Sequence, residues 1–231
     1  MTMTSKLFQL AGRWTGQDMP SAGMMAETKV DGWRAGYFRG RAGKPGLWTR
    51  GGQPIEGTGH ILHKLAIMEA VAGCALFLDG EFQVAGTLEA TKAWCERGWK
   101  AGGEAGTFHL FDCLTDAEWR AGGSERPLWQ RKAWLAEIWA AVPKHPLSWE
   151  YRPGSHGREP STPIVEIMPD EWVCDQADIE ALASRVWVAG GEGLMVKDAE
   201  APHRRGRSDA WLKVKHRNYV PGLGVQWKES A

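Results

Sequence analysis

The segment Lys29-Val30-Asp31-Gly32-Trp33-Arg34 combines residue types that suit nucleophilic chemistry on a phosphate. A lysine attacks phosphorus only as the neutral amine, so such a residue must lose its proton, which burial or nearby positive charge favours. Gly32 lets the backbone approach a ligand closely, and the planar guanidinium of Arg34 matches phosphate or sugar oxygens. The alternative interpretation is a surface strand that ends in a tight Asp-Gly turn.

Two carboxylates lie in or beside predicted strands, where a purely structural strand would seldom carry a charge. Glu81 follows Asp79-Gly80 within an apolar run, and Glu192 directly precedes the apolar residues 193–196. Carboxylates beside a phosphate are the ligands that Mg²⁺ commonly uses in proteins. These two residues are therefore candidates for a metal–phosphate site.

Two lysines near the C-terminus point to the same kind of site. Lys213 and Lys215 alternate with apolar residues, so both side chains face one side of the predicted strand. By themselves they fit a solvated edge strand. An anion between them would relieve their repulsion, and together with Lys29 and Arg34 they favour a phosphate-binding site.

The composition is that of an ordinary globular protein. The 231 residues suffice for one large domain or two small ones. The 28 basic and 28 acidic residues balance, so only a local patch could reveal a nucleic-acid partner. Most of the 14 tryptophans are expected in the core or in a groove.

The remaining composition signals indicate a soluble, reducing setting. His60 and His63 lack a companion cysteine pair, so we do not expect them to bind a metal. Residues 1–10 do not form a signal sequence and no apolar run could span a bilayer, so we expect a cytoplasmic protein without a membrane partner. Four widely spaced cysteines predict reduced thiols: Cys74, Cys95, Cys113 and Cys174.

The pattern of apolar residues, glycines and prolines predicts a mixed fold. Helices are predicted over residues 59–72, 87–99 and 127–142, and from a cap at Asp175 or Asp178 to about 188. Strands are predicted over residues 24–38, 75–85, 107–114, 163–169, 193–197 and 210–216. Residues 147–162 predict a mobile loop. Because helices and strands do not strictly alternate, we expect an α+β fold with antiparallel sheets.

Several segments resemble the ordered motifs of the covalent nucleotidyltransferases, which comprise ATP-dependent DNA ligases, RNA ligases and mRNA capping enzymes. Residues 29–34 are similar to the first motif. The later motifs resemble Thr49-Arg50-Gly51-Gly52, Leu78-Asp79-Gly80-Glu81, Phe111-Asp112, Glu192-Gly193-Leu194-Met195-Val196-Lys197 and Trp211-Leu212-Lys213-Val214-Lys215. The resemblance implies an ATP-grasp-like adenylation (nucleotidyltransferase) domain of class α+β, with antiparallel sheets flanked by helices.

The resemblance also implies a mechanism. Lys29 attacks the α-phosphorus of ATP, releases pyrophosphate and carries AMP covalently. Lys213 and Lys215 stabilise the α-phosphate, where charge develops. Glu192 and Glu81 serve Mg²⁺, which offsets the phosphate charge and favours the unprotonated amine. The AMP then passes to a 5′-phosphate at a nick, and the 3′-hydroxyl displaces it.

The nucleotide-binding residues follow from the same resemblance. Phe111 is expected to stack on the purine, Glu81 to contact the ribose or a metal-bound water, and Glu27 to read the adenine amino group. The complete implied set is Glu27, Thr28, Val30, Arg34, Arg50, Glu81, Phe111, Met195, Lys213 and Lys215.

A basic run identifies the branch of the superfamily. Arg204-Arg205-Gly206-Arg207-Ser208 resembles a segment of small viral and bacterial DNA ligases. Arg204, Arg205, Arg207 and Ser208 are therefore expected to bind DNA phosphates, and the chain is interpreted as an ATP-dependent DNA ligase of bacterial or phage origin. The alternatives are an RNA ligase, a capping-type enzyme that uses GTP, and a nick-binding module without turnover.

The expected organisation is an adenylation domain at residues 1–217 and a tail at 218–231. Family members normally add an oligonucleotide-binding (OB) barrel after the fifth motif, and the residues after Lys215 are too few for one. Three hypotheses remain: a minimal monomeric ligase that uses Arg217, Lys228 or the basic run instead, an accessory protein that supplies the OB function, or a truncated chain. The expected partner is nicked double-stranded DNA.

Overall fold

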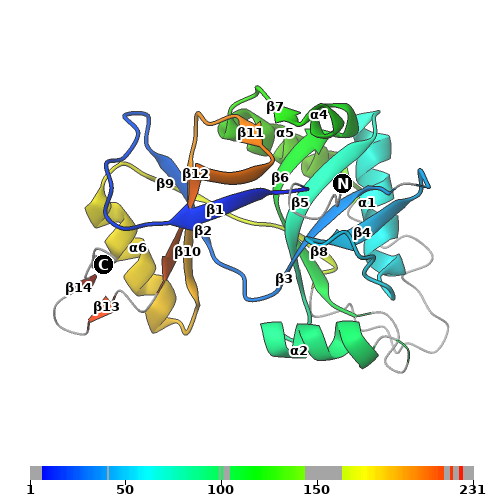
Figure 1. Ribbon diagram of the computed structural model, residues 1–231, viewed down its shortest axis with the longest axis horizontal. Coiled ribbons are helices and arrows are strands. Elements are labelled where there is room, and N and C mark those ends of the chain that lie inside the picture. Colours follow the sequence, from blue (N-terminus) through cyan, green and yellow to red (C-terminus); the bar gives the residue numbers. More distant parts are fainter. Residues whose placement is uncertain are drawn as a thin grey trace.

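The computed structural model describes residues 7–40, 42–98, 100, 105–143, 163–215, 219–220 and 224–225. Two five-stranded sheets lie side by side; the helix α6 (Gln176–Val188) packs on one of them, and α1 (Gly59–Ala72) and α5 (Leu128–Ala141) pack on the other (Figure 1). The predicted mobile loop at 147–162 and most of the predicted tail lie outside the described residues. Helices and predominantly antiparallel strands confirm the α+β prediction, although two strand pairs are parallel.

The first sheet, called sheet A, contains the strand that leads to Lys29. Its order is β1 (Gln9–Arg13), β12 (Gly206–Lys215), β10 (Gly193–Asp198), β2 (Met24–Thr28) and β9 (Glu171–Val173). Helix α6 (Gln176–Val188) packs on one face of this sheet through Ile179, Leu182 and Ala183. The side chain of Asp175 accepts from the Asp178 backbone N–H and caps this helix, as the sequence predicts.

The second sheet, called sheet B, carries the other half of the motifs. Its order is β4 (Pro45–Thr49), β3 (Trp33–Arg39), β5 (Leu76–Gln83), β6 (Thr107–Thr115) and β8 (Val165–Ile167). Helices α1 (Gly59–Ala72) and α5 (Leu128–Ala141) cover one face of it with residues such as Ile61, Leu65 and Leu135. This helix-covered face forms the largest apolar core.

Shorter elements complete the described chain. They are α2 (Leu88–Ala93), the π-helical segment η2 (Trp94–Gly98), α4 (Asp116–Ala121), β7 (Gly123–Ser124), β11 (His203–Arg204), β13 (Tyr219–Val220) and β14 (Gly224–Val225). The sequence did not predict α4, whose N-terminus has a capping box formed by Thr115 and Glu118. The predicted strand over 24–38 is instead two strands, because residues 29–32 connect sheet A to sheet B.

The two-residue period of a strand divides the faces of sheet A by chemistry. Leu194, Val196 and Val214 face α6 and belong to its apolar cluster. Lys197 and Lys213 occupy alternate positions of the same strands and line a cavity on the opposite face. Sheet A therefore presents its charged residues toward sheet B.

Two consecutive basic residues of α5 are buried among the sheets. Arg131 is fully buried and binds both carboxylate oxygens of Asp112, with distances of 2.8 and 2.9 Å. Burial opposes ionisation of Asp112, but Arg131 outweighs it and lowers the pKa of this carboxyl to about 2. Lys132 is 6% exposed and binds Glu27 of β2, so α5 links both sheets.

The described helices include none that is long and apolar enough to cross a membrane.

Replacing Arg131 with Met is expected to lower the free energy of unfolding by about 3–5 kcal/mol, because Asp112 would keep a buried charge without its partner. Chemical denaturation measures the change. The control is Arg185→Met, which removes an exposed ion pair with Glu171 and is expected to cost less than about 1 kcal/mol. Similar losses in the two variants would contradict the structural role of the buried pair.

Candidate active site

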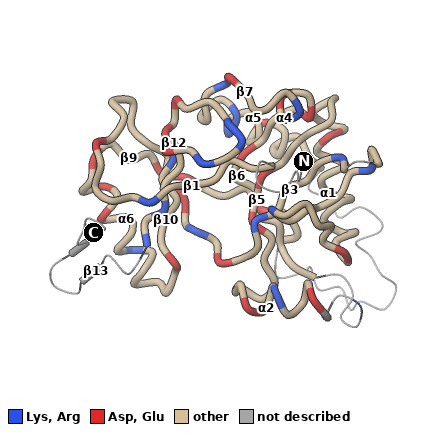
Figure 2. The backbone as a smooth tube through the Cα atoms, in the orientation of Figure 1, with Lys and Arg blue, Asp and Glu red and all other residues tan. Residues whose placement is uncertain are grey.

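A cavity of about 720 Å³ lies between the two sheets and collects residues from most of the motif-like segments. Basic residues from both sheets lie near the middle of the molecule, where the sheets approach each other (Figure 2). The residues that line the cavity and were predicted to act there are Glu27, Thr28, Lys29, Val30, Arg34, Arg50, Glu81, Phe111, Met195, Arg207 and Lys213.

Lys29 directly follows β2 and is fixed by the neighbouring strand. Its backbone N–H donates to the carbonyl of Gly193 at 2.8 Å. Its Nζ lies 2.5 Å from Oε2 of Glu192, and Nζ of Lys215 lies 2.8 Å from the other oxygen of the same carboxylate. Burial opposes ionisation of Glu192, but the hydrogen bonds from Lys215 and Lys29 outweigh it and lower its pKa. Glu192 is therefore an anion shared by two lysines.

Gly32 is required by the packing of the backbone against a neighbouring strand. A Cβ atom at this position would lie 2.5 Å from the backbone oxygen of Phe82, so only glycine fits beside β5. The carboxylate of Asp31 accepts from the backbone N–H of Leu88 at 3.1 Å, at the start of α2. The Asp-Gly pair thus fixes the backbone that follows Lys29. Gly32 also lines the cavity, and close approach of a ligand to its backbone stays a prediction.

The guanidinium of Arg34 forms its hydrogen bonds with other groups of the protein. Its Nε and Nη2 each lie 2.7 Å from an oxygen of the buried Asp79, and Nη2 also donates to the carbonyl of Gln9 at 3.1 Å. The guanidinium lies 4.6 Å from the ring centre of Phe111. Arg34 lines the cavity and supports the aromatic ring; its contact with a nucleotide remains a prediction.

The end of the cavity that contains Lys29 and Lys213 is strongly basic, and we call it the basic end. Lys213 and Arg207 line both the main cavity and an adjoining space of about 270 Å³, to which Arg13 and Lys215 also contribute. Burial and then the like charges of Lys29 and Lys215 lower the pKa of Lys213. Such mutual repulsion favours the binding of an anion with several negative charges.

At the opposite end of the cavity, the carboxylate of Glu27 lies among the lining residues together with the aromatic rings of Phe111 and Trp211. Glu27 is 2% exposed and accepts from Lys132, and from Lys197 at 2.5 Å. The Lys197 ammonium lies 4.3 Å from the ring centre of Phe111 and 4.5 Å from that of Trp211. Apolar ring faces beside a hydrogen-bonding carboxylate suit a flat, nitrogen-containing base.

Glu81 occupies the side of the cavity formed by sheet B, where it pairs in register with Arg34. Burial raises the pKa of Glu81 to about 7, although Arg34 and Lys29 oppose the shift. This carboxyl can therefore gain or lose a proton near neutral pH.

The predicted DNA-binding run is divided by the structure. Arg207 lines the cavity, whereas Arg204 binds both carboxylate oxygens of Glu125 at 2.7 and 2.6 Å. The guanidinium of Arg205 lies over the ring of Trp119, and Ser208 accepts from the backbone of Ala210. Neither Arg204, Arg205 nor Ser208 is among the cavity-lining residues.

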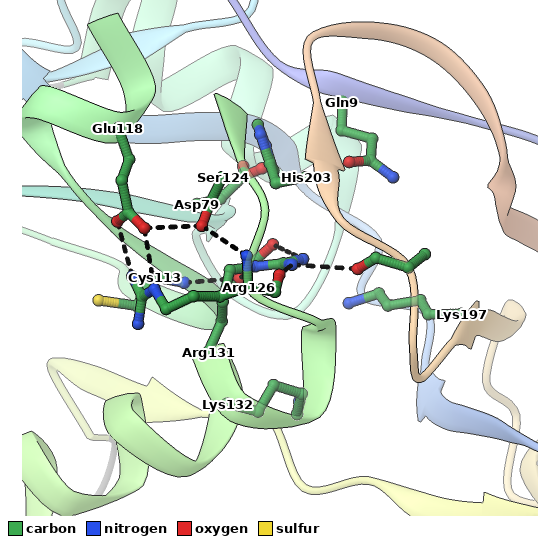
Figure 3. Close-up of polar contacts among 12 residues, drawn as sticks. Gln9, Asp79, Cys113, Glu118, Ser124, Arg126, Arg131, Lys132, Lys197 and His203 are labelled. Atoms are coloured by element: carbon green, nitrogen blue, oxygen red, sulfur yellow. Dashed lines mark hydrogen bonds and ion pairs between the residues drawn. The ribbon is translucent and has the colours of Figure 1, made fainter. Parts of the chain in front are cut away.

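Sequence reasoning missed residues that support the cavity from outside the motifs. Arg131 and Lys132 belong to this set, and so does the buried His203, whose pKa burial lowers to about 4. Figure 3 shows Arg131, Lys132, Lys197 and His203 in one buried polar cluster. A signal did exist, because Arg131 and Lys132 interrupt the apolar stripe of α5 at helical spacing.

The residues present fit Mg²⁺ only in combination with a ligand. No group of three His, Cys, Asp or Glu side chains among the described residues could hold a metal ion by itself. Glu81 lines the cavity, whereas Glu192 is not among its lining residues and reaches it through its contact with Lys29. Mg²⁺ commonly binds through one or two carboxylates together with phosphate oxygens and water. These two residues would hold the ion when a triphosphate is bound.

A family model described as the ATP dependent DNA ligase domain matches residues 11–215. The chain belongs to this ligase-domain family. The match includes every cavity-lining residue except Leu10, and it confirms the resemblance inferred from the motifs and the adenylation-domain fold. The ligase domain matches no curated protein sequence.

Solved structures share the fold of this ligase domain. The structure named Pmar-Lig_Pre. has a TM-score of 0.69 and 22% identity, over 93% of this chain and 47% of that chain. The ligase domain thus spans about half the length of that protein. The ATP complex of the bacteriophage T7 ATP-dependent DNA ligase has a TM-score of 0.67 and 18% identity, over 94% and 70% of the two chains.

A third structure comes from a virus. The Chlorella virus DNA ligase-adenylate has a TM-score of 0.63 and 17% identity, over 92% of this chain and 67% of that chain. At these identities the likeness establishes the adenylation-domain fold. The roles of individual residues rest on the geometry of the cavity.

The raised pKa of Glu81 predicts a pH-dependent stability. Between pH 4.5 and about 7 the folded protein retains a proton that an unfolded glutamate has lost. Stability should therefore fall as the pH rises through this window. Glu81→Gln cannot titrate, so the free energy of unfolding of the wild type should decrease relative to that of this variant. Chemical denaturation across the window measures the difference.

Glu56→Gln is the control, since Glu56 lines the same cavity but is exposed. If the wild type and Glu81→Gln show parallel stability profiles, burial does not perturb the Glu81 carboxyl.

Proposed function

We propose that this ligase domain uses ATP to form a lysyl-adenylate on Lys29 and seals 5′-phosphate/3′-hydroxyl nicks in duplex DNA. The observation that carries the proposal is the shared carboxylate of Glu192, which holds Lys29 and Lys215 at one end of a cavity whose other end suits a purine. A triphosphate bound along this cavity would place its α-phosphorus near the amine.

The charges at the basic end support phosphoryl transfer. Lys213 lines the cavity beside Lys29, and Arg207 adds a further cation. In transfer to the amine, the Lys29 Nζ–phosphorus bond forms while the bond to the β-phosphate oxygen breaks, and pyrophosphate leaves with the electron pair. Fixed cations next to the equatorial oxygens stabilise the charge in the transition state.

The proton on Lys29 must leave before the attack. Glu192 pairs with the Lys29 ammonium and is the carboxylate nearest to that amine. A Mg²⁺ ion bound by Glu192, Glu81 and phosphate oxygens would offset phosphate charge and favour the neutral amine.

The second half of the proposal concerns DNA. AMP would pass from Lys29 to the 5′-phosphate of a nick, and attack by the 3′-hydroxyl would then release AMP and close the strand. The DNA must bring its 5′-phosphate to the basic end of the cavity, where Arg207 and Arg13 lie. An accessory protein and a monomeric state remain predictions from the sequence.

Lys29→Ala is expected to abolish the protein–AMP adduct after incubation with ATP and Mg²⁺, because no amine remains to attack the phosphorus. Intact-mass spectrometry measures the adduct. Lys44→Ala is the control, since Lys44 lies exposed in the turn between β3 and β4 and should retain labelling. Persistence of the adduct in Lys29→Ala would show that another group is the nucleophile. Parallel incubation with GTP tests the capping-type alternative.

Arg207→Gln is expected to weaken binding to nicked duplex DNA and to reduce the salt dependence of the binding constant by about one ion. Arg204→Gln provides the comparison, because Glu125 already holds that guanidinium. Titration of labelled nicked DNA at several salt concentrations measures both slopes. If the salt dependence changed more in the Arg204 variant than in the Arg207 variant, the DNA would instead contact the basic residues on the side of α4 and β7.

A further inference from the structure

We propose that Lys132 of α5 is a positioning residue that selects adenine by fixing the carboxylate of Glu27 at the base end of the cavity. The inference rests on the proposed function, since it assumes that a purine nucleotide binds there. Glu27 lines the cavity, whereas Lys132 is not among the lining residues. Lys132 therefore acts through Glu27.

The hydrogen bonds of Lys132 leave its ammonium no freedom to read a base. Its Nζ binds Oε1 of Glu27, Oδ2 of Asp170 at 2.8 Å and the carbonyl of Met168 at 3.4 Å. An ammonium has three donors, and each of these acceptors takes one. The two carboxylates raise the pKa of Lys132 against the effect of burial, so the residue remains charged.

The two ends of this ion bridge differ in exposure. Glu27 is 2% exposed, and the side chain of Asp170 is 25% exposed just before β9. Asp170 therefore binds Lys132 from the partly exposed side, and Lys132 in turn binds Glu27 in the protein interior. The second oxygen of Glu27 is bound by Lys197, so the carboxylate cannot rotate without breaking a buried hydrogen bond.

A rigid carboxylate discriminates between purines by the group at position 6. Adenine offers an amino group that donates to an acceptor, whereas hypoxanthine and guanine offer a carbonyl oxygen that a carboxylate repels. A 6-oxo purine could still donate its N1–H to a carboxylate displaced by a small distance. Selection therefore requires Glu27 to be held in one place, which is the role that the contacts of Lys132 provide.

Equilibrium binding of ATP and inosine triphosphate tests the inference without the chemical step. Calorimetry on Lys29→Ala protein, which cannot form the adduct, gives the ratio of the two dissociation constants. We expect ATP to bind about tenfold or more tightly, and Lys132→Met to bring the ratio toward one. A general loss of packing would weaken both nucleotides and leave the ratio unchanged.

Lys92→Met is the matched control. Lys92 lines the same cavity, and no contact joins it to Glu27 among the described residues. Its removal should weaken both triphosphates equally and preserve the ratio. An unchanged ratio in folded Lys132→Met, or an equal change in Lys92→Met, would overturn the inference.

Asp170→Asn keeps the inference testable if Lys132→Met does not fold. This change weakens the hold on Lys132 from the partly exposed side and should lower the ATP preference in the same direction; an unchanged preference would overturn the inference. If the Lys29→Ala protein bound both triphosphates tightly and equally, the inference about Lys132 would be overturned, but the proposed nucleotide site would not. Failure of both nucleotides to bind would overturn the proposed function as well.

Discussion

The compensation of buried charge is the constraint on which the centre of this molecule depends. A charge removed from water must be paired and hydrogen-bonded, or it destabilises the fold. Asp112 with Arg131 and Glu27 with two lysines satisfy that requirement in the interior. Glu192, which is partly exposed, is paired with both Lys29 and Lys215. At the basic end of the cavity the same requirement is met only in part, which is why this end suits an anionic ligand.

The alternation of side chains along sheet A makes such a site compatible with a stable fold. One face of the sheet is apolar and is covered by α6, so the neighbouring positions are free to carry lysines and carboxylates. Sheet B contributes Arg34, Glu81 and Phe111 from the face opposite α1 and α5, where an apolar cluster that includes Phe8 and Trp119 covers another part of the sheet. The cavity is the space that two such sheets leave between their polar faces.

Helix α5 connects the site to the core. Its apolar residues pack on sheet B, while Arg131 and Lys132 reach the strands that carry Phe111 and Glu27. Stability and base recognition would therefore depend on the same helix.

The sequence by itself determined the fold class, most helices, the central strands of both sheets and the set of motif residues, because periodicity and local spacing are properties of the chain. The edge strands β1, β4 and β9 were not predicted. The family match and the common cavity confirm the resemblance, although the roles of single residues remain predictions. Only the tertiary structure decided that Gly32 serves strand packing, that Arg34 binds Asp79 and that the basic run is divided. Those outcomes depend on partners that are 45 residues apart for Arg34 and Asp79 and 79 residues apart for Arg204 and Glu125, and local spacing does not encode such pairings.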